Sequence, residues 1–345
     1  MKQTYDVNVK EFKPLTSPAL IKDELPLTEE AVQTVINGRK NVENILKGTD
    51  KRLLVIAGPC SIHDPEAALE YARKMKELQQ EVKDKVCLIM RVYFEKPRTT
   101  VGWKGMINDP GLDDSHEVDQ GLRIARSLLL EINGMGVPTA TELLDPITPQ
   151  YIAGLLTWVA IGARTTESQT HREMASGLSM PVGFKNSTDG SLNAAINAMK
   201  AAGSPQHFLG IDPNGMCCAV STKGNPFGHI VLRGGHTPNY DPVSVGKVQA
   251  ILREKEMMEA VMIDCSHDNS GQKFKGQPFV FKSVLDQRLD GNDRIIGMML
   301  ESNLFEGSQK CSGGICDLQY GVSITDECIS WETTASLVRC AHGRL

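Results

Sequence analysis

The sequence predicts an α/β protein built as a (β/α)8 TIM barrel, with an N-terminal extension and an inserted β-hairpin before strand six. Eight short apolar runs alternate with helical patterns along the 345 residues. Neither a glycine-rich dinucleotide fingerprint nor a Walker loop interrupts this alternation. Regular alternation of this kind gives a parallel sheet, and eight units fit a closed barrel better than an open sheet.

The first strand-like run shows the pattern most clearly. Five apolar residues, 53–57, stand between the charged pair 51–52 and Gly58-Pro59, which is typical of a strand buried on both faces. Asp64 then offers an N-cap and Pro65 a first helical residue, and apolar side chains recur at helical spacing up to residue 78. Cys60 therefore lies at the carboxyl end of a strand, where α/β enzymes place their catalytic groups.

The rest of the chain repeats this unit. The other seven strand-like runs are 86–94, 138–144, 158–163, 181–185, 229–233, 261–264 and 295–301, and helical patterns include 149–156 and 168–178. Two short β-like runs in 207–222, around Pro213-Asn214-Gly215, predict the inserted hairpin. Residues 1–48 predict an arm and one helix that make oligomer or regulatory contacts, and residues 49–345 the catalytic barrel.

Composition gives no reason to expect a nucleic acid or a membrane as a partner. The net charge is −5, and no apolar run approaches the roughly 18 residues of a membrane span. The first ten residues contain no apolar signal core, so a cytoplasmic location is expected. Nine cysteines, an odd number, indicate reduced thiols, and Cys217-Cys218 and Cys311 with Cys316 lack zinc-site spacing.

In a parallel barrel the ends of all strands form one rim. The rim residues are predicted to be Cys60, Arg91, Lys96, Arg98, Glu142, Arg164, Lys185, Arg233, His267 and Glu301. Six of these ten are cationic although the protein is acidic, and arginine forks match phosphate and carboxylate oxygens. The rim therefore predicts a pocket for small substrates that carry several negative charges.

The same rim offers ligands for a metal ion. Cys60, His267 and Glu301 come from strands one, seven and eight, which are neighbours once the barrel closes, and Asp326 follows strand eight. A thiolate, an imidazole and carboxylates suit Mn²⁺, Fe²⁺ or Zn²⁺. Asp264 and Asp268 stay open as alternative carboxylate ligands.

Several motifs resemble those of the class I (type I alpha) 3-deoxy-D-arabino-heptulosonate-7-phosphate (DAHP) synthases. They are Gly58-Pro-Cys-Ser-Ile-His-Asp64, the segment 91–105, Gly162-Ala-Arg-Thr-Thr-Glu-Ser-Gln169, the segment 181–186, Leu232-Arg-Gly-Gly235, Asp264-Cys-Ser-His267 and Glu301-Ser-Asn303. The resemblance extends from about residue 10 to the end of the chain. It implies a metal-dependent condensation of phosphoenolpyruvate with D-erythrose 4-phosphate and water, the first step of the shikimate pathway.

The resemblance also implies roles for individual residues. One divalent ion (Mn²⁺, Fe²⁺, Co²⁺ or Zn²⁺) would be bound by Cys60, His267, Glu301 and Asp326. Phosphoenolpyruvate would contact Arg91, Lys96, Gly162, Ala163, Arg164, Lys185 and Arg233, and erythrose 4-phosphate would contact Pro97, Arg98 and Thr99. The catalytic residues would be Lys96, Lys185, Glu142 and His267.

Feedback inhibition by an aromatic amino acid is a further implication of the resemblance. The effector residues would be Asp145, Pro146, Pro149, Gln150, Leu178 and Ser179, away from the rim and near a subunit interface of a homodimer or homotetramer. The motifs at 141–146, 168–174 and 178–181 look more like those of tyrosine-regulated members than of phenylalanine-regulated ones.

Three rival functions are open at this point. A Schiff-base aldolase would use Lys185 as its nucleophile. A 3-deoxy-manno-octulosonate-8-phosphate synthase would use arabinose 5-phosphate, but Lys96-Pro-Arg-Thr99 and the long N-terminal arm argue against it. A barrel without catalysis would bind anions or aromatic amino acids only, and the complete rim set argues against that reading.

Overall fold

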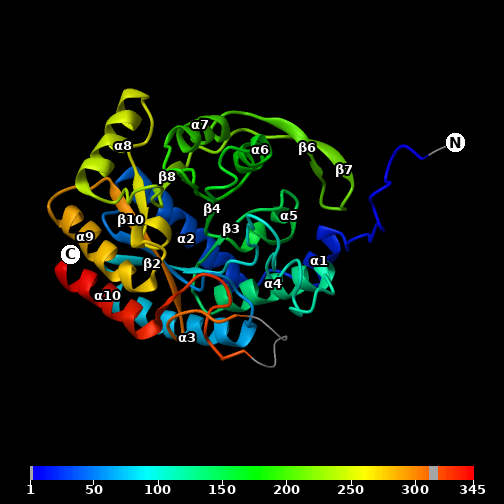
Figure 1. The fold of residues 1–345 in the computed structure, drawn as a ribbon, viewed down its shortest axis with the longest axis horizontal. Coiled ribbons are helices and arrows are strands. Elements are labelled where there is room, and N and C mark those ends of the chain that lie inside the picture. Colours follow the sequence, from blue (N-terminus) through cyan, green and yellow to red (C-terminus); the bar gives the residue numbers. More distant parts are fainter. Residues whose placement is uncertain (1–2, 311–317) are drawn as a thin grey trace.

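The structure is a computed structural model that describes residues 3–310 and 318–345. Eight parallel strands close into a barrel in the order β1-β2-β3-β4-β5-β8-β9-β10, because β1 also pairs with β10. Helices surround this barrel, and the two termini lie on opposite sides of it (Figure 1). The predicted (β/α)8 barrel is therefore confirmed.

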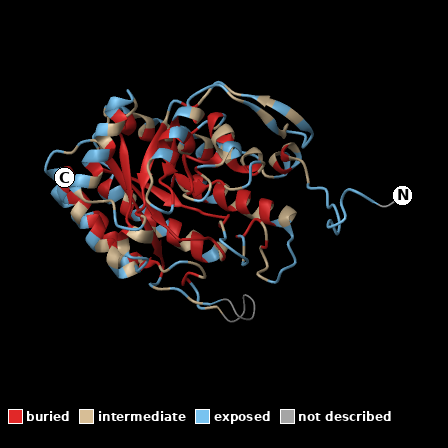
Figure 2. Cartoon of the chain, turned by 45° about the horizontal axis from the view of Figure 1, so that its top comes forward, coloured by how far each residue is buried: buried red, intermediate tan, exposed pale blue. Residues whose placement is uncertain are grey.

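The barrel strands are short and nearly all of their residues are buried. They are β1 (Leu53–Gly58), β2 (Val86–Arg91), β3 (Thr139–Glu142), β4 (Trp158–Ile161), β5 (Val182–Lys185), β8 (Gly228–Leu232), β9 (Val261–Asp264) and β10 (Ile295–Asn303). A two-residue strand, β11 (Ile329–Ser330), pairs with the end of β10. Figure 2 shows the strands as the buried centre of the molecule, within helices whose outer faces are exposed.

Each helix after β1 follows a strand, as predicted, but two helices precede β1, where residues 1–48 were expected to form only one. They are α1 (Pro18–Glu24), α2 (Glu29–Lys47), α3 (Pro65–Val82), α4 (Val118–Gly134), α5 (Pro149–Ile152), α6 (Gln169–Ser176), α7 (Asn193–Ala202), α8 (Pro242–Glu254), α9 (Gln277–Leu289) and α10 (Trp331–Arg344). Three 3₁₀ turns are η1 (Ala153–Leu155), η2 (His267–Ser270) and η3 (Phe274–Gly276). Asp64 caps α3 as predicted, since its side chain accepts hydrogen bonds from the backbone N–H of Glu66 and Ala67.

One predicted helix is only partly α-helical. The pattern over 149–156 forms one α turn, α5, and then the 3₁₀ turn η1. The Arg39 guanidinium donates hydrogen bonds to the carbonyls of Ala153 (2.8 Å) and Leu156 (2.9 Å). A side chain from α2 thus satisfies carbonyls at the end of this segment, which has no further helical turn to satisfy them.

Helix α2 closes the bottom of the barrel. Its residues Val42, Ile45 and Leu46 belong to the apolar cluster inside the barrel, together with strand residues such as Trp158. The buried His229 accepts a hydrogen bond from the Trp158 indole N–H at 3.1 Å, within the same layer. A division of the chain at residue 48 stays a prediction, but α2 contributes directly to the barrel core.

The inserted hairpin is also confirmed. Strands β6 (His207–Ile211) and β7 (Cys217–Ser221) pair antiparallel directly before β8, the sixth barrel strand. The hairpin extends beyond the helical layer, close to the N-terminal arm (Figure 1), and the backbone N–H of Ala19 donates to the Pro213 carbonyl at its tip. None of the described helices is both long and apolar enough to cross a membrane.

Candidate active site

A cavity of about 530 Å³ opens at the carboxyl ends of the barrel strands. Its walls include most of the predicted site residues, namely Lys96, Pro97, Arg98, Thr99, Glu142, Gly162, Ala163, Arg164, Lys185, Arg233, His267, Glu301 and Asp326. The two other residues predicted for catalysis, substrate or metal, Cys60 and Arg91, are buried and contact Lys96 and Glu301 of this wall. Residues predicted as one rim therefore share one cavity.

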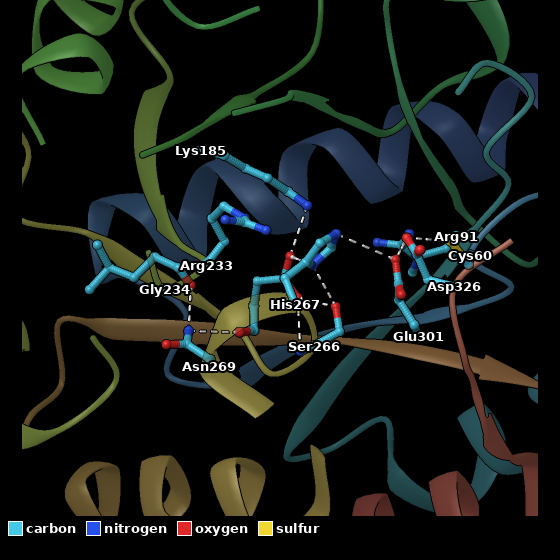
Figure 3. Close-up of polar contacts among 12 residues, drawn as sticks. Cys60, Arg91, Lys185, Arg233, Gly234, Ser266, His267, Asn269, Glu301 and Asp326 are labelled. Carbon is cyan, nitrogen blue, oxygen red and sulfur yellow. Dashed lines mark hydrogen bonds and ion pairs between the residues drawn. The ribbon is translucent and has the colours of Figure 1, made fainter. Parts of the chain in front are cut away.

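Three possible metal ligands lie at one end of the cavity. The Cys60 thiol, a Glu301 carboxylate oxygen and an Asp326 carboxylate oxygen all lie within 4.8 Å of one another. His267 is not part of that tight group, but its Nε2 lies 3.8 Å from Glu301 Oε1 (Figure 3). The four predicted ligands thus converge, with the imidazole at the edge of the cluster.

Local structure fixes the direction of His267. Its backbone has φ +56°, a left-handed conformation that is uncommon for a residue other than glycine. Its Nδ1 lies 2.9 Å from Asp264 Oδ2 and 2.7 Å from Ser266 Oγ, so Nδ1 carries a proton toward Asp264. This leaves Nε2 free to face Glu301, as Figure 3 shows.

Four buried cations of the site each contact a polar or anionic partner. Arg91 Nη2 lies 3.1 Å from Glu301 Oε1, and Lys185 Nζ lies 2.8 Å from Asp264 Oδ2. Lys96 donates to the Cys60 sulfur at 3.0 Å, and Arg233 pairs with Asp268. These partners replace the hydration that the cations lose on burial.

The protonation states follow from this burial. Burial, helped by the negative charge of Glu301, raises the pKa of Cys60 to about 12, so the thiol stays protonated at neutral pH. Burial alone would raise the pKa of Asp264, but its contacts with His267 and Lys185 hold that pKa well below its usual value. Asp264 is therefore an anion that orients His267 and Lys185.

Glu142 lies against a glycine on the opposite wall. A Cβ atom at Gly162 would lie only 2.1 Å from Glu142 Oε1. That oxygen is buried and has no hydrogen-bond partner among the described residues. Because Gly162 has no side chain, the Glu142 carboxylate can occupy the space beside it.

The loop after β2 carries the residues predicted for the sugar phosphate. Arg98 and Thr99 are exposed at the mouth of the cavity, and the Arg98 guanidinium packs against Gly102. Glu95 joins this loop to the next one, because its carboxylate accepts from the backbone N–H of Leu144 (3.3 Å) and Asp145 (3.0 Å). Burial raises the pKa of Glu95 to about 8.

The predicted effector residues lie outside this cavity. None of Asp145, Pro146, Pro149, Gln150, Leu178 and Ser179 belongs to its described lining. The segment around Pro149 contacts the N-terminal arm, since the Tyr151 hydroxyl donates to the Thr16 carbonyl at 2.9 Å. A site there would be separate from the catalytic cavity and next to the arm.

Sequence reasoning missed several residues that support the site. Asp264 was expected only as an alternative ligand, whereas it holds Lys185 and His267. Gln277 was not predicted. Its side-chain amide donates a hydrogen bond to the backbone carbonyl of Glu301 and accepts one from the backbone N–H of Glu301. Tyr93, whose ring packs against the Arg91 guanidinium, could have been found, because it lies two residues after Arg91 and therefore on the same face of an extended segment.

Comparisons with known proteins identify the family. A sequence profile described as the DAHP synthetase I family matches residues 25–339. This chain belongs to the DAHP synthetase I family. Among DAHP synthase relatives, the Tyr-sensitive phospho-2-dehydro-3-deoxyheptonate aldolase of Escherichia coli is 54% identical over 98% of this chain and 95% of its own. The Phe-sensitive enzyme of the same organism is also 54% identical, over 98% of this chain and 96% of its own.

A solved structure gives the same answer for the fold. The phospho-2-dehydro-3-deoxyheptonate aldolase of Francisella tularensis superposes with a TM-score of 0.95, at 46% sequence identity, over 98% of each chain. The chain is therefore an enzyme of the DAHP synthetase I family with that family's barrel. The residue roles within the cavity rest on geometry and chemistry.

Proposed function

We infer that this chain is a DAHP synthase, which condenses phosphoenolpyruvate with D-erythrose 4-phosphate and water to give DAHP and inorganic phosphate. The observation that carries this inference is one cavity that combines Lys96, Arg164, Lys185 and Arg233 with the acidic cluster around Glu301. Both substrates are phosphate esters that repel each other, so the site must neutralise several negative charges. The names of the relatives support the same reaction.

The donor set of the acidic cluster fits one divalent metal ion. Cys60, His267, Glu301 and Asp326 would hold it, with a mixture of sulfur, nitrogen and oxygen donors that suits Mn²⁺, Fe²⁺, Co²⁺ or Zn²⁺. The ion would supply Lewis-acid polarisation of the aldehyde oxygen of erythrose 4-phosphate. Asp264 supports this set by fixing the tautomer of His267.

Positive side chains hold the two substrates in the rest of the cavity. Arg91, Lys96, Arg164, Lys185 and Arg233, with the backbone N–H groups of Gly162 and Ala163, bind phosphoenolpyruvate in this proposal. Pro97, Arg98 and Thr99 at the mouth bind the phosphate of the sugar. The two anions would then lie side by side, with the loop after β2 contributing to both sites.

The reaction needs one proton to leave the attacking water and one proton to reach the aldehyde oxygen. Carbon 3 of phosphoenolpyruvate forms a bond to the aldehyde carbon, and Lys96 Nζ stabilises the oxygen that becomes an alkoxide and then gains a proton. Water adds to carbon 2, and Glu142 takes the proton that this water loses, while Lys185 stays a cation that holds the substrate. The adduct then breaks its bond between carbon 2 and the phosphate oxygen and releases inorganic phosphate. His267, held by Asp264, keeps its Nε2 directed at the acidic cluster.

The geometry disfavours a Schiff-base aldolase. A lysine nucleophile must be a neutral amine, whereas Lys185 Nζ lies 2.8 Å from the fully buried Asp264 carboxylate. That ion pair favours the charged ammonium. Lys185 thus serves better as a cation for the substrate than as a nucleophile.

Tyrosine is the effector that we propose, bound around Asp145, Pro146, Pro149, Gln150, Leu178 and Ser179. The chain is 54% identical to the Tyr-sensitive relative and 54% to the Phe-sensitive one, so the identity alone does not decide between them. The motifs at 141–146 and 168–174 favour tyrosine. The arm before α1 exposes Tyr5 (72%) and Phe12 (78%), which suits contact with a second copy in a homodimer or homotetramer.

One assay tests the reaction. Release of inorganic phosphate and formation of DAHP should both require phosphoenolpyruvate, erythrose 4-phosphate and a divalent ion, and EDTA should abolish them. Replacing erythrose 4-phosphate by arabinose 5-phosphate should reduce turnover at least a hundredfold. Full turnover in EDTA, together with borohydride trapping of Lys185, would instead establish the Schiff-base mechanism. Tyrosine, phenylalanine and tryptophan added one at a time identify the effector.

A further inference from the structure

Three buried polar atoms at the carboxyl ends of β2 and β3 have no hydrogen-bond partner among the described residues. They are Arg91 Nη1, the Tyr93 hydroxyl and Glu142 Oε1. Such atoms are rare in folded proteins, because each one loses its hydrogen bonds to water on burial. Three of them in one part of the barrel indicate a place where a polar molecule is bound.

The strand register brings the three residues together. Arg91 pairs with Ala140 in the β2–β3 ladder, and the next bond of the ladder joins the Val92 N–H to the Ala140 carbonyl at 2.7 Å. Extending this register by two residues places Tyr93 beside Glu142. Side chains two residues apart lie on the same face, so Arg91 and Tyr93 both point into the barrel.

Contacts around Tyr93 support this placement. The Arg91 guanidinium lies over the Tyr93 ring, 3.9 Å from its centroid, and Tyr93 is only 1% exposed. Burial, with the charges of Glu142 and Asp264 opposing that of Arg91, raises the pKa of Tyr93, so its hydroxyl keeps its proton. The residue thus supplies a flat ring for Arg91 and a neutral O–H group next to Glu142.

The chemistry of the three atoms identifies what they hold. Arg91 Nη1 can only donate, and the Tyr93 hydroxyl can donate. Glu142 Oε1 can only accept, so it cannot bind phosphoenolpyruvate, whose carboxylate and phosphate oxygens are acceptors as well. A water molecule satisfies both sides, because it donates one proton to Glu142 and accepts from the Tyr93 O–H.

We propose that Tyr93 is a further active-site residue, whose hydroxyl holds, together with Glu142 Oε1, the water that adds to carbon 2 of phosphoenolpyruvate. This proposal rests on the DAHP synthase function inferred above. As the water oxygen forms its bond to carbon 2, one water proton passes to Glu142 Oε1, and Tyr93 keeps its own proton. The Tyr93 ring has a second role, since it orients the guanidinium of Arg91 toward the substrate.

The Tyr93→Phe variant separates the two roles, because it removes only the hydroxyl. We expect kcat to fall about tenfold to hundredfold, while KM for phosphoenolpyruvate stays within about twofold. The melting temperature should stay the same or rise, because the lost hydroxyl makes no hydrogen bond to any described residue. Tyr93→Leu also removes the ring, and it should raise KM for phosphoenolpyruvate about tenfold as well.

Tyr71→Phe is the matched control. Tyr71 is an equally buried tyrosine, but it lies on the helix α3 and its hydroxyl donates to Ser302 Oγ at 2.9 Å. Its loss should lower the melting temperature and leave kcat within twofold. The two variants should therefore show opposite effects on stability and on turnover.

Three results would overturn the proposal. One is a kcat of Tyr93→Phe within twofold of that of the wild type. Another is a loss of activity that parallels a loss of stability, as in a structural role. The last is a tenfold rise in KM for phosphoenolpyruvate in Tyr93→Phe, which would assign the hydroxyl to substrate binding. A wild-type enzyme that forms no DAHP would instead refute the proposed function, so the two failures are distinct.

Discussion

The contact between Gly162 and Glu142 leads to a sharp prediction about catalysis. In Gly162→Ala the new Cβ would lie 2.1 Å from Glu142 Oε1, whereas ordinary contacts begin near 3.4 Å. Restoring an ordinary contact needs a movement of about 1.3 Å, obtained from the difference of those two distances. A misplacement of about 1 Å in a catalytic group costs about a hundredfold in rate. We therefore expect kcat to fall about a hundredfold.

The assay compares turnover with stability in two alanine variants. Gly246 lies on the exposed face of α8, and a Cβ placed there would meet no atom within 4 Å apart from its chain neighbours and the helix's own backbone. Gly246→Ala should keep full activity and gain about 0.5–1 kcal/mol of folding free energy from the stiffer unfolded chain. Gly162→Ala should lose activity and keep a cooperative unfolding transition, because its strain falls on one side chain.

A double-mutant cycle shows whether the effect of Gly162→Ala passes through Glu142. Glu142→Gln should reduce kcat by itself, because it removes the proton acceptor and preserves the side-chain volume. Adding Gly162→Ala to Glu142→Gln should then cost less than tenfold more. Full additivity of the two effects, or a Gly162→Ala enzyme with wild-type kcat, would refute the catalytic placement of Glu142.

Three more predictions concern the cluster, the lysine and the barrel core. Cys60→Ala should weaken divalent-ion binding at least a hundredfold in equilibrium dialysis, with Cys87→Ala, a buried cysteine elsewhere in the barrel, as a control that keeps its affinity. Because the Cys60 pKa is about 12, binding of the ion must release the thiol proton, and wild-type affinity should rise with pH between 6 and 9. Lys185→Met should abolish turnover, and borohydride with erythrose 4-phosphate should leave wild-type Lys185 unmodified. A covalent adduct on Lys185 would contradict the ion-pair assignment. His229, whose pKa burial lowers to about 4, is neutral in both folded and unfolded chains above pH 6.5, and below it only the unfolded chain gains the proton. As the pH falls from 6.5 to 4, the free energy of unfolding measured in urea should fall by up to about 3 kcal/mol more in the wild type than in His229→Gln. The same pH dependence in both proteins would contradict this prediction.

The fold could be predicted from the sequence because its signals are local. The run at residues 53–57 contains only apolar residues, and Asp64 and Pro65 mark the start of the helix that follows. Such a βα unit can therefore be recognised from its local sequence. Closure of the barrel then brings the strand ends to one rim without any further information. For this reason the cavity includes nearly every residue predicted at the strand ends.

The partners of these residues could not be predicted in the same way, because they depend on register and on backbone conformation. The pair Arg91–Glu301 requires that β2 and β10 both flank β1, and the direction of His267 requires its left-handed backbone. The position of Glu142 depends on the missing side chain of Gly162. No pattern in the neighbouring sequence predicts this ion pair, this backbone conformation or this side-chain position.

Contacts between proposed metal ligands and buried cations couple the binding of the metal ion to the binding of phosphoenolpyruvate. Two proposed metal ligands, Glu301 and Cys60, hold the two buried cations Arg91 and Lys96 at 3.1 and 3.0 Å. A ligand that turns its donor atom to an ion weakens its hold on the cation beside it. Ion binding would therefore release Arg91 and Lys96 toward phosphoenolpyruvate, which supplies the negative charge that these cations then lack. Because such coupling is reciprocal, phosphoenolpyruvate would in turn favour the ion, and one cavity would assemble both sites together.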